Sequence, residues 1–194
     1  MIITQQRMRF SVRPIVTVTF IVITLFTSAV KAQTEPGAQV PASCPAGIPQ
    51  TAGEEAFLLR PNGEVLHIAS NLIFMRCSLG QTWNGNTCLN EPRAYNWQEA
   101  LQASVSDTTN GLMSWRLPNV KELSVISERG CVRPSINDTI FPNTSPDDYW
   151  TSSPSAIDES AAWSVAFNNA SITQRLKTRS MFVRLVRTKV AADN

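Results

Sequence analysis

The chain has 194 residues, 43% of them hydrophobic and 16% charged, with a formal net charge of +2. This composition excludes a disordered or collagen-like chain and is typical of one globular domain with a core. So small a net charge gives no support to a nucleic-acid partner, and none is expected.

The first 32 residues are typical of a secretory signal peptide. Arg7, Arg9 and Arg13 precede the apolar run "PIVTVTFIVITLFTSAV", which ends in the small-residue pattern "VKA". We expect cleavage after Ala32; the alternative is an uncleaved membrane anchor, because the run is long for a signal and short for a span. Cleavage removes four cations and no acid, so the mature chain, residues 33–194, carries −2.

Four cysteines lie after the signal, and an even count in an exported chain predicts two disulfides. The segment from Cys77 to Cys88 is rich in turn residues, so we expect these two to pair and Cys44 to pair with Cys131. A rival arrangement, Cys44 with Cys88 and Cys77 with Cys131, stays open. No metal site or cofactor is expected, because there is no Cys-x-x-Cys and His67 is the only histidine.

Residues 33–53 are rich in Pro, Gly and Ala and are interpreted as an extended leader, and the domain is expected over residues 54–190. The turn signal Pro61-Asn62-Gly63 between two apolar runs predicts a β-hairpin within residues 55–68. The run "NLIFMRC" continues as a buried strand.

A helix is predicted next, with Asn96 as N-cap and Glu99 as its capping-box partner. Its apolar face carries Trp97, Ala100, Leu101 and Val105.

The stretch "WRLPNVKELSVIS" predicts a second capped helix. Asn119 and Glu122 have capping-box spacing, so Glu122 is interpreted as a cap partner and not as an acid catalyst. Arg116, between two apolar residues, is expected to be part-buried and bonded to carbonyls or an acid. The residues expected to face the core are Val120, Leu123 and Ile126.

The last third indicates β-structure. The segment "YWTSS" is β-prone, and "AWSVAFNNA" alternates like a half-buried strand. The segment "MFVRLVRT" is expected to be a terminal strand with Met181, Val183 and Leu185 on one face, and the hairpin at residues 55–68 is one candidate partner. The predicted class is therefore α+β: two helices in the middle and strands at both ends.

Seven pieces in order resemble the Lcl C-terminal-like domain, a bacterial family of unknown function named for the end domain of a collagen-like adhesin. They are "FMRCSLGQTWNGNTC", "YNWQEAL", "WRLPNVKEL", "INDTIFPNT", "YWTSSPS", "AWSVAFNNA" and "VRLVR". The resemblance covers residues 55–188. It implies a C-type-lectin-like fold: antiparallel sheets, two flanking helices, paired N- and C-terminal strands, and long irregular loops that carry whatever binds.

The chain departs from the family pattern in three ways. The first strand reads "NLIF" where "GLMW" is common, Ser114 replaces an Asp before "WRLP", and the collagen-like region is absent. Adhesion therefore does not carry over directly.

No nucleophile–base group stands out, so we expect no enzyme. The rival hypothesis is an enzyme related to formylglycine-generating enzymes, which share the fold implied by the resemblance. Such chemistry needs reactive cysteines close together, whereas all four are better explained as disulfides.

Loop oxygens are the calcium ligands to consider, and the candidates are Asp147, Asp148, Asp158 and Glu159. The acid-Pro-Asn triplet of calcium-dependent lectins is missing, its nearest counterpart being Glu91-Pro92-Arg93, so a solvated acidic loop is favoured. The Asn-x-Ser/Thr triplets at Asn137, Asn143 and Asn169 are interpreted as turns.

The C-terminal basic series is the candidate patch for an anionic ligand. Arg175, Lys177 and Arg179 alternate as on one face of a strand, and Arg184 follows. Such a strip suits an anionic polysaccharide or membrane headgroups, but charges on an edge strand also serve to prevent aggregation.

The sequence thus predicts a periplasmic or secreted, non-catalytic module that binds a glycan or an envelope protein. Contact with a membrane is expected only if the signal segment is retained. A third hypothesis is a structural accessory domain of an envelope complex.

Overall fold

The computed structural model describes residues 44–45, 47–111 and 114–193. The expected signal peptide and most of the leader lie outside these residues. Within them, no helix has the length and apolarity needed to cross a membrane.

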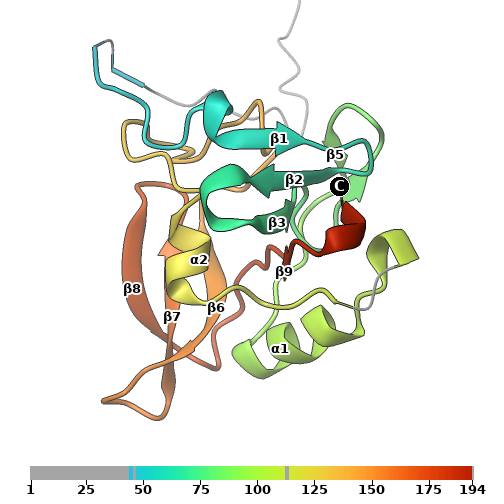
Figure 1. Ribbon diagram of the computed structural model, residues 1–194. Helices are drawn as coiled ribbons and strands as arrows, with labels where there is room; N and C mark the ends of the chain where they lie inside the picture. Colours follow the sequence, from blue (N-terminus) through green and yellow to red (C-terminus); the bar gives the residue numbers. More distant parts are fainter. Residues whose placement is uncertain (1–43, 46, 112–113, 194) are drawn as a thin grey trace, which may run out of the picture. The chain divides into compact units, whose positions relative to one another are not determined.

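Two antiparallel sheets and two helices form the domain, so the predicted α+β class is confirmed (Figure 1). The C-type-lectin-like assignment stays a prediction. The four-stranded sheet has the order β1-β2-β3-β9, from β1 (Phe57–Leu59), β2 (Glu64–His67), β3 (Leu72–Met75) and β9 (Val186–Thr188). The three-stranded sheet consists of β6 (Asp148–Pro154), β7 (Ala161–Ala166) and β8 (Ser171–Leu176). A short hairpin pairs β4 (Thr82–Trp83) with β5 (Cys88–Leu89).

Both helices begin at the predicted caps. In α1 (Trp97–Ser106), Asn96 Oδ1 accepts from Glu99 N at 2.9 Å, and Glu99 Oε2 accepts from Asn96 N. In α2 (Val120–Ser124), Asn119 and Glu122 make the same reciprocal pair. Since these bonds join residues only three apart, local sequence suffices to specify them.

Alternate strand residues fill two separate core clusters. Val65 and Phe74 enter the first cluster with Leu123 of α2, whereas Leu66 and Ile73 enter the second. Ala100 of α1 also belongs to the second cluster. The β-strand period of two therefore buries both faces of the sheets.

Two burial predictions need correction. Strand β7 is buried on both faces, not half-buried, because it is the central strand of its sheet and both core clusters cover it. In α1, Val105 is 69% exposed, and Ser104 takes the buried position one residue earlier. The expected burial of Leu123 and Ile126 and of Met181, Val183 and Leu185 is confirmed.

The partner of the terminal strand also differs from the prediction. Strand β9 pairs with β3 and not with the hairpin, because β2 already has β1 on one edge and β3 on the other. The N- and C-terminal strands, β1 and β9, therefore lie at opposite edges of the sheet. Only Val186–Thr188 of the terminal segment is regular strand; Met181 and Phe182 make single bridges to Tyr95 and Tyr149.

Candidate functional site: a cleft beside the Cys77–Cys88 hairpin

Two disulfides, Cys77–Cys88 and Cys44–Cys131, are present, which confirms the predicted pairing. In the first disulfide, the Cα atoms of Cys77 and Cys88 are 5.4 Å apart, within the usual range. The second disulfide attaches the leader, at Cys44, to the loop after α2.

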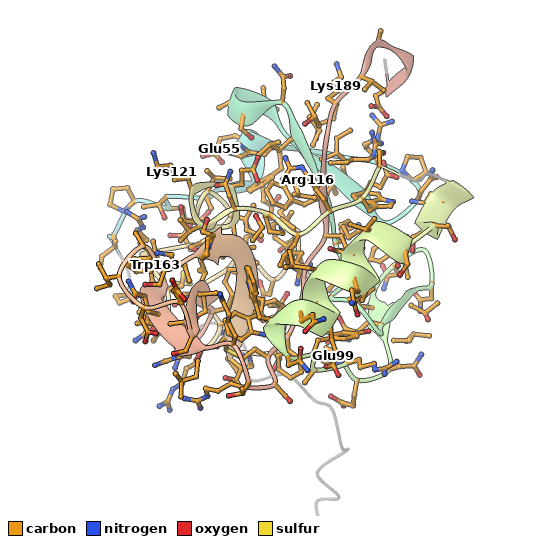
Figure 2. All side chains as sticks on the ribbon, turned by 90° about the horizontal axis from the view of Figure 1, so that it is seen from below. Glu55, Glu99, Arg116, Lys121, Trp163 and Lys189 are labelled. Carbon is orange, nitrogen blue, oxygen red and sulfur yellow. A yellow bond between two sulfur atoms is a disulfide. The ribbon has the colours of Figure 1, made fainter. Side chains whose placement is uncertain are left out.

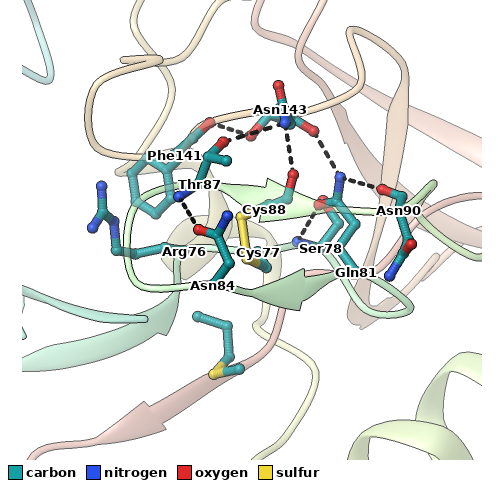
Figure 3. The surroundings of a disulfide bond; sticks show 12 residues. Arg76, Cys77, Ser78, Gln81, Asn84, Thr87, Cys88, Asn90, Phe141 and Asn143 are labelled. Carbon is teal, nitrogen blue, oxygen red and sulfur yellow. Dashed lines mark hydrogen bonds between the residues drawn. A yellow bond between two sulfur atoms is a disulfide. The ribbon is translucent and has the colours of Figure 1, made fainter. Parts of the chain in front are cut away.

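Side-chain amides hold the Cys77–Cys88 hairpin in place (Figure 3). Gln81 accepts from Ser78 N at 2.9 Å and donates to the carbonyls of Asn90 and Asn143. Asn143 in turn donates to Cys88 O at 2.6 Å. The hairpin is therefore a fixed wall and not a loose loop.

A cleft runs between this hairpin and the C-terminal end of α1. It comprises two adjoining hollows of about 530 and 400 Å³, which share Leu79, Asp107 and Thr109. Met75, Leu79 and Leu185 supply its apolar lining. Its polar lining comprises Asn62, Ser78, Gln81, Thr82, Ser106, Asp107, Thr108, Thr109 and Asn110.

The far rim, residues 107–110, is positioned by hydrogen bonds of its own. Asp107 Oδ1 accepts from Thr109 N at 2.8 Å, and Thr109 O accepts from the indole of buried Trp115 at 3.0 Å. Asn110 has a left-handed backbone, φ 60°, and its Nδ2 donates to Glu64 Oε1 at 2.8 Å.

Glu64 belongs to a buried ion cluster that anchors this rim. Its Oε2 lies 2.8 Å from Arg187 and 3.3 Å from Arg60. Arg187 also pairs with Asp193 at 2.7 Å, and these bonds hold the pKa of Asp193 well below its usual range. The C-terminal turn is thus linked to the cleft through Glu64.

Trp83 forms part of the hairpin wall. The Arg76 guanidinium lies 4.2 Å from the centroid of its ring, and Gly63, at φ +74°, leaves the room that a Cβ would take from it. The indole Nε1 is buried and has no acceptor among the described residues. A buried donor without an acceptor is uncommon in folded proteins.

Only one charged side chain, Asp107, lines the described part of the cleft. The lining therefore combines hydroxyl, amide and apolar groups with one negative charge. Such a surface suits a neutral or cationic ligand and disfavours an anion.

The predicted anionic-ligand patch is not a continuous surface. Arg184 is fully buried, and burial lowers its pKa to about 10, so this prediction is wrong for Arg184. Its guanidinium donates to the carbonyls of Met75 and Arg76 and to the hydroxyls of Ser78 and Thr144. A cation surrounded by internal oxygens is hydrogen-bonded without facing solvent.

The other three basic residues are at or near the surface, but two of them are bound to oxygen atoms of the same chain. Arg175 Nε lies 2.9 Å from Asp148 Oδ2. Lys177 Nζ donates to Glu159 O at 2.7 Å and lies 4.5 Å from the Trp97 ring centroid. Arg179 is exposed.

The remaining candidates have local structural roles. Arg116 and Glu122 form a two-point ion pair at 2.7 Å, as expected, and this bond lowers the pKa of Glu122. His67, the half-buried last residue of β2, lies with its Nδ1 2.8 Å from Ser70 Oγ, and it does not line the cleft.

The acidic loop and the Asn-x-Ser/Thr triplets also stabilise turns. Asp158 accepts from the backbone and hydroxyl of Ser160, and the described residues contain no group of three potential metal ligands. Asn137 and Asn169 cap backbone amides, whereas Asn143 supports the hairpin.

The family model described as the Lcl C-terminal domain matches residues 63–187. The chain belongs to this family. In this Lcl C-terminal domain, the matched range includes the hairpin wall, both helices, and Glu64 and Arg187 of the ion cluster. No curated protein matches the chain.

Sequence reasoning missed the cleft rim at residues 107–110. The signal that was available is "DTTNG", a cluster of turn-forming residues directly after a predicted helix. Its closeness to the hairpin depends on tertiary packing, which this signal does not contain.

Proposed function

We propose that this chain is an exported, non-catalytic binding domain that holds a neutral, hydroxyl-rich glycan in the cleft between the Cys77–Cys88 hairpin and residues 107–110. The observation that carries the proposal is the lining: hydroxyl and amide groups over an apolar floor, with Asp107 as its only described charge. Sugars present hydroxyls and C–H faces, which match these two kinds of surface.

Export is supported by the signal-like N-terminus and the two disulfides, which persist in oxidising compartments. A binding role without catalysis is supported by the state of the reactive groups. All four cysteines are paired, and Ser78 Oγ is bonded to Tyr149 and Arg184 in the floor of the cleft. A thiol needs to be free and ionised to act as a nucleophile.

The test is a glycan array with neutral and sulfated glycans, probed with residues 33–194 at low and high salt. We expect retention of neutral glycans that changes little with salt, because no ion pair with the ligand is broken. Retention of sulfated glycans alone, lost at high salt, would contradict the proposal and favour the exposed basic residues as the site.

A further inference from the structure

Strand β8 is an open edge of the three-stranded sheet. In the described part of the chain it pairs only with β7, and it forms the outer side of the sheet in Figure 1. Lys177 N donates to Ser160 O at 2.8 Å, which makes these two a hydrogen-bonded pair. By the alternation of antiparallel ladders, the backbone groups of Ile172, Gln174 and Leu176 therefore point away from β7. Of these, the Leu176 carbonyl already accepts from Arg179 N at 2.9 Å, so a second strand would share this acceptor.

Two of these three residues, Ile172 and Leu176, place apolar side chains at this edge. Ile172 is 40% exposed and Leu176 is 53% exposed. Trp163, which faces Gln174 across the β7–β8 ladder, is half-buried beside them. Trp163 lies well apart from Glu99 of α1 (Figure 2), and β8 approaches α1 only at its end, where Trp97 N donates to Lys177 O at 3.0 Å.

The charges of this strand are directed back onto its own chain. Cations on an edge strand usually prevent edge-to-edge pairing. Here Arg175 is held by Asp148 at 2.9 Å, and Lys177 by the carbonyl of Glu159 at 2.7 Å. Neither charge blocks the approach of another strand.

We propose that β8 pairs antiparallel with β8 of a second copy, with Gln174 opposite Gln174 on the twofold axis. This register sets Ile172 opposite Leu176 of the second copy, twice, so that both exposed apolar side chains become paired. Opposite apolar side chains stabilise a ladder.

The avoidance of like-charge contacts favours this register over the neighbouring one. With Gln174 on the axis, Arg175 meets Thr173 of the second copy and Lys177 meets Ser171. Moving the axis to Leu176 would set Arg175 opposite Lys177, and like charges directly opposite destabilise a ladder. Moving it to Ile172 would leave Leu176 without its apolar partner.

The resulting dimer is weak and carries two clefts. A contact made through one strand of six residues is smaller than a standard stable interface. Its value lies in avidity, since a surface that displays many copies of a ligand binds two clefts more tightly than one. The dimer itself does not depend on what the cleft binds.

The test is the mass of residues 33–194 by analytical ultracentrifugation over rising concentration. The variants are Gln174→Pro and, as the matched control, Gln174→Ala. Both variants remove the Gln174 side chain, which accepts from Ser155 Oγ at 3.0 Å. Proline also removes the outward-pointing N–H, which an edge strand tolerates, whereas alanine keeps it. We expect the mass of the wild type and Gln174→Ala to rise towards two chains, while Gln174→Pro stays monomeric with an unchanged far-ultraviolet CD spectrum.

A wild type that stays monomeric throughout overturns the proposal, as does a Gln174→Pro variant that dimerises like the wild type. The register is tested separately by Gln174→Cys, which sets the new cysteines about 5.5 Å apart at Cα, suitable for a disulfide. We expect a cross-linked dimer from Gln174→Cys and none from Ser171→Cys; equal cross-linking of the two overturns the register. Should Gln174→Pro fail to fold, Ile172→Lys, which buries a charge in the pair, replaces it with the same expected loss of dimer.

Discussion

The two disulfide-bonded regions contain the same covalent bond but differ in what surrounds it. Cys77–Cys88 closes a short hairpin whose inner side lines the cleft, and Gln81 and Asn143 brace it. Cys44–Cys131 joins residues 87 apart in sequence and does not line the cleft. Near this bridge, Glu128 accepts hydrogen bonds from the backbone N–H groups of Thr51 and Ala52.

A disulfide can therefore affect stability and function separately. In the chain-entropy model, stabilisation grows with loop length, so the long bridge contributes more to stability. The short bridge contributes less, but it shapes the wall of the cleft. The variants below separate the two effects.

The largest loss of stability is expected for the double variant Cys44→Ser with Cys131→Ser. The free energy of unfolding should fall by about 4 kcal/mol, because a long loop is released in the unfolded chain. Urea unfolding in non-reducing buffer measures it. Glycan retention by the folded variant should equal that of the wild type, and a loss of retention would place the binding site near this bridge.

Cys77→Ser with Cys88→Ser should lower the free energy of unfolding by about 3 kcal/mol and weaken glycan retention as well. In oxidising buffer the variant keeps Cys44–Cys131, so its melting temperature should lie below that of the oxidised wild type but above that of the wild type in reductant, which lacks both bridges. If the folded variant retains glycans as well as the wild type does, the hairpin is not part of the site.

Glu128→Gln tests the noncovalent half of the leader attachment. Burial alone would raise the pKa of Glu128, but hydrogen bonds from Thr51, Ala52 and Gly130 outweigh it and lower the pKa. We expect a loss of about 2 kcal/mol at pH 7, typical of hydrogen bonds to a charged group.

The pH dependence of this loss has a definite sign. A lowered folded-state pKa stabilises the fold above the unfolded-state value of about 4.5, and this stabilisation disappears as pH falls through the folded-state pKa. The gap between wild type and Glu128→Gln in urea unfolding should therefore narrow below pH 4.5. A gap that stays constant or widens on acidification would contradict the stated role of the carboxylate.

The smallest effect is expected at the opposite rim. Asn110→Gly keeps the left-handed backbone but removes the hydrogen bond to buried Glu64, so stability should fall by about 1 kcal/mol. Asn71→Gly is the matched control, because Asn71 is also left-handed, at φ 53°, and exposed. Thermal unfolding of both variants compares them; equal losses would show that the effect belongs to the backbone and not to Glu64.

The sequence predicted the features that depend on neighbouring residues. Both capping boxes join residues three apart, and the Cys77–Cys88 pair closes across a short turn-rich segment. The α+β class followed from the order of helical and strand periods.

Features that join distant segments were missed or misplaced. Arg184 was expected at the surface because it follows a series of alternating basic residues, but its partners Met75, Arg76 and Thr144 lie far away in sequence. The predicted partner of the terminal strand was wrong for a similar reason. Strand β9 pairs with the edge of β3 that β2 leaves free, and the order of strands in the sheet is not apparent from the sequence. The cleft arises where residues 77–83 meet residues 107–110, and no local pattern records that meeting.

We propose the cleft beside the Cys77–Cys88 hairpin as the binding site, and a bulky side chain placed inside the cleft tests this proposal directly. Thr82 is exposed and lines the cleft, whereas Thr178 is exposed and lies outside both of its hollows. Thr82→Trp and Thr178→Trp therefore add the same bulk inside and outside the site, and both are compared with the wild type on the array of neutral and sulfated glycans. We expect Thr82→Trp to lose neutral-glycan retention and Thr178→Trp to keep it; unchanged retention by a folded Thr82→Trp variant would show that the glycan binds elsewhere.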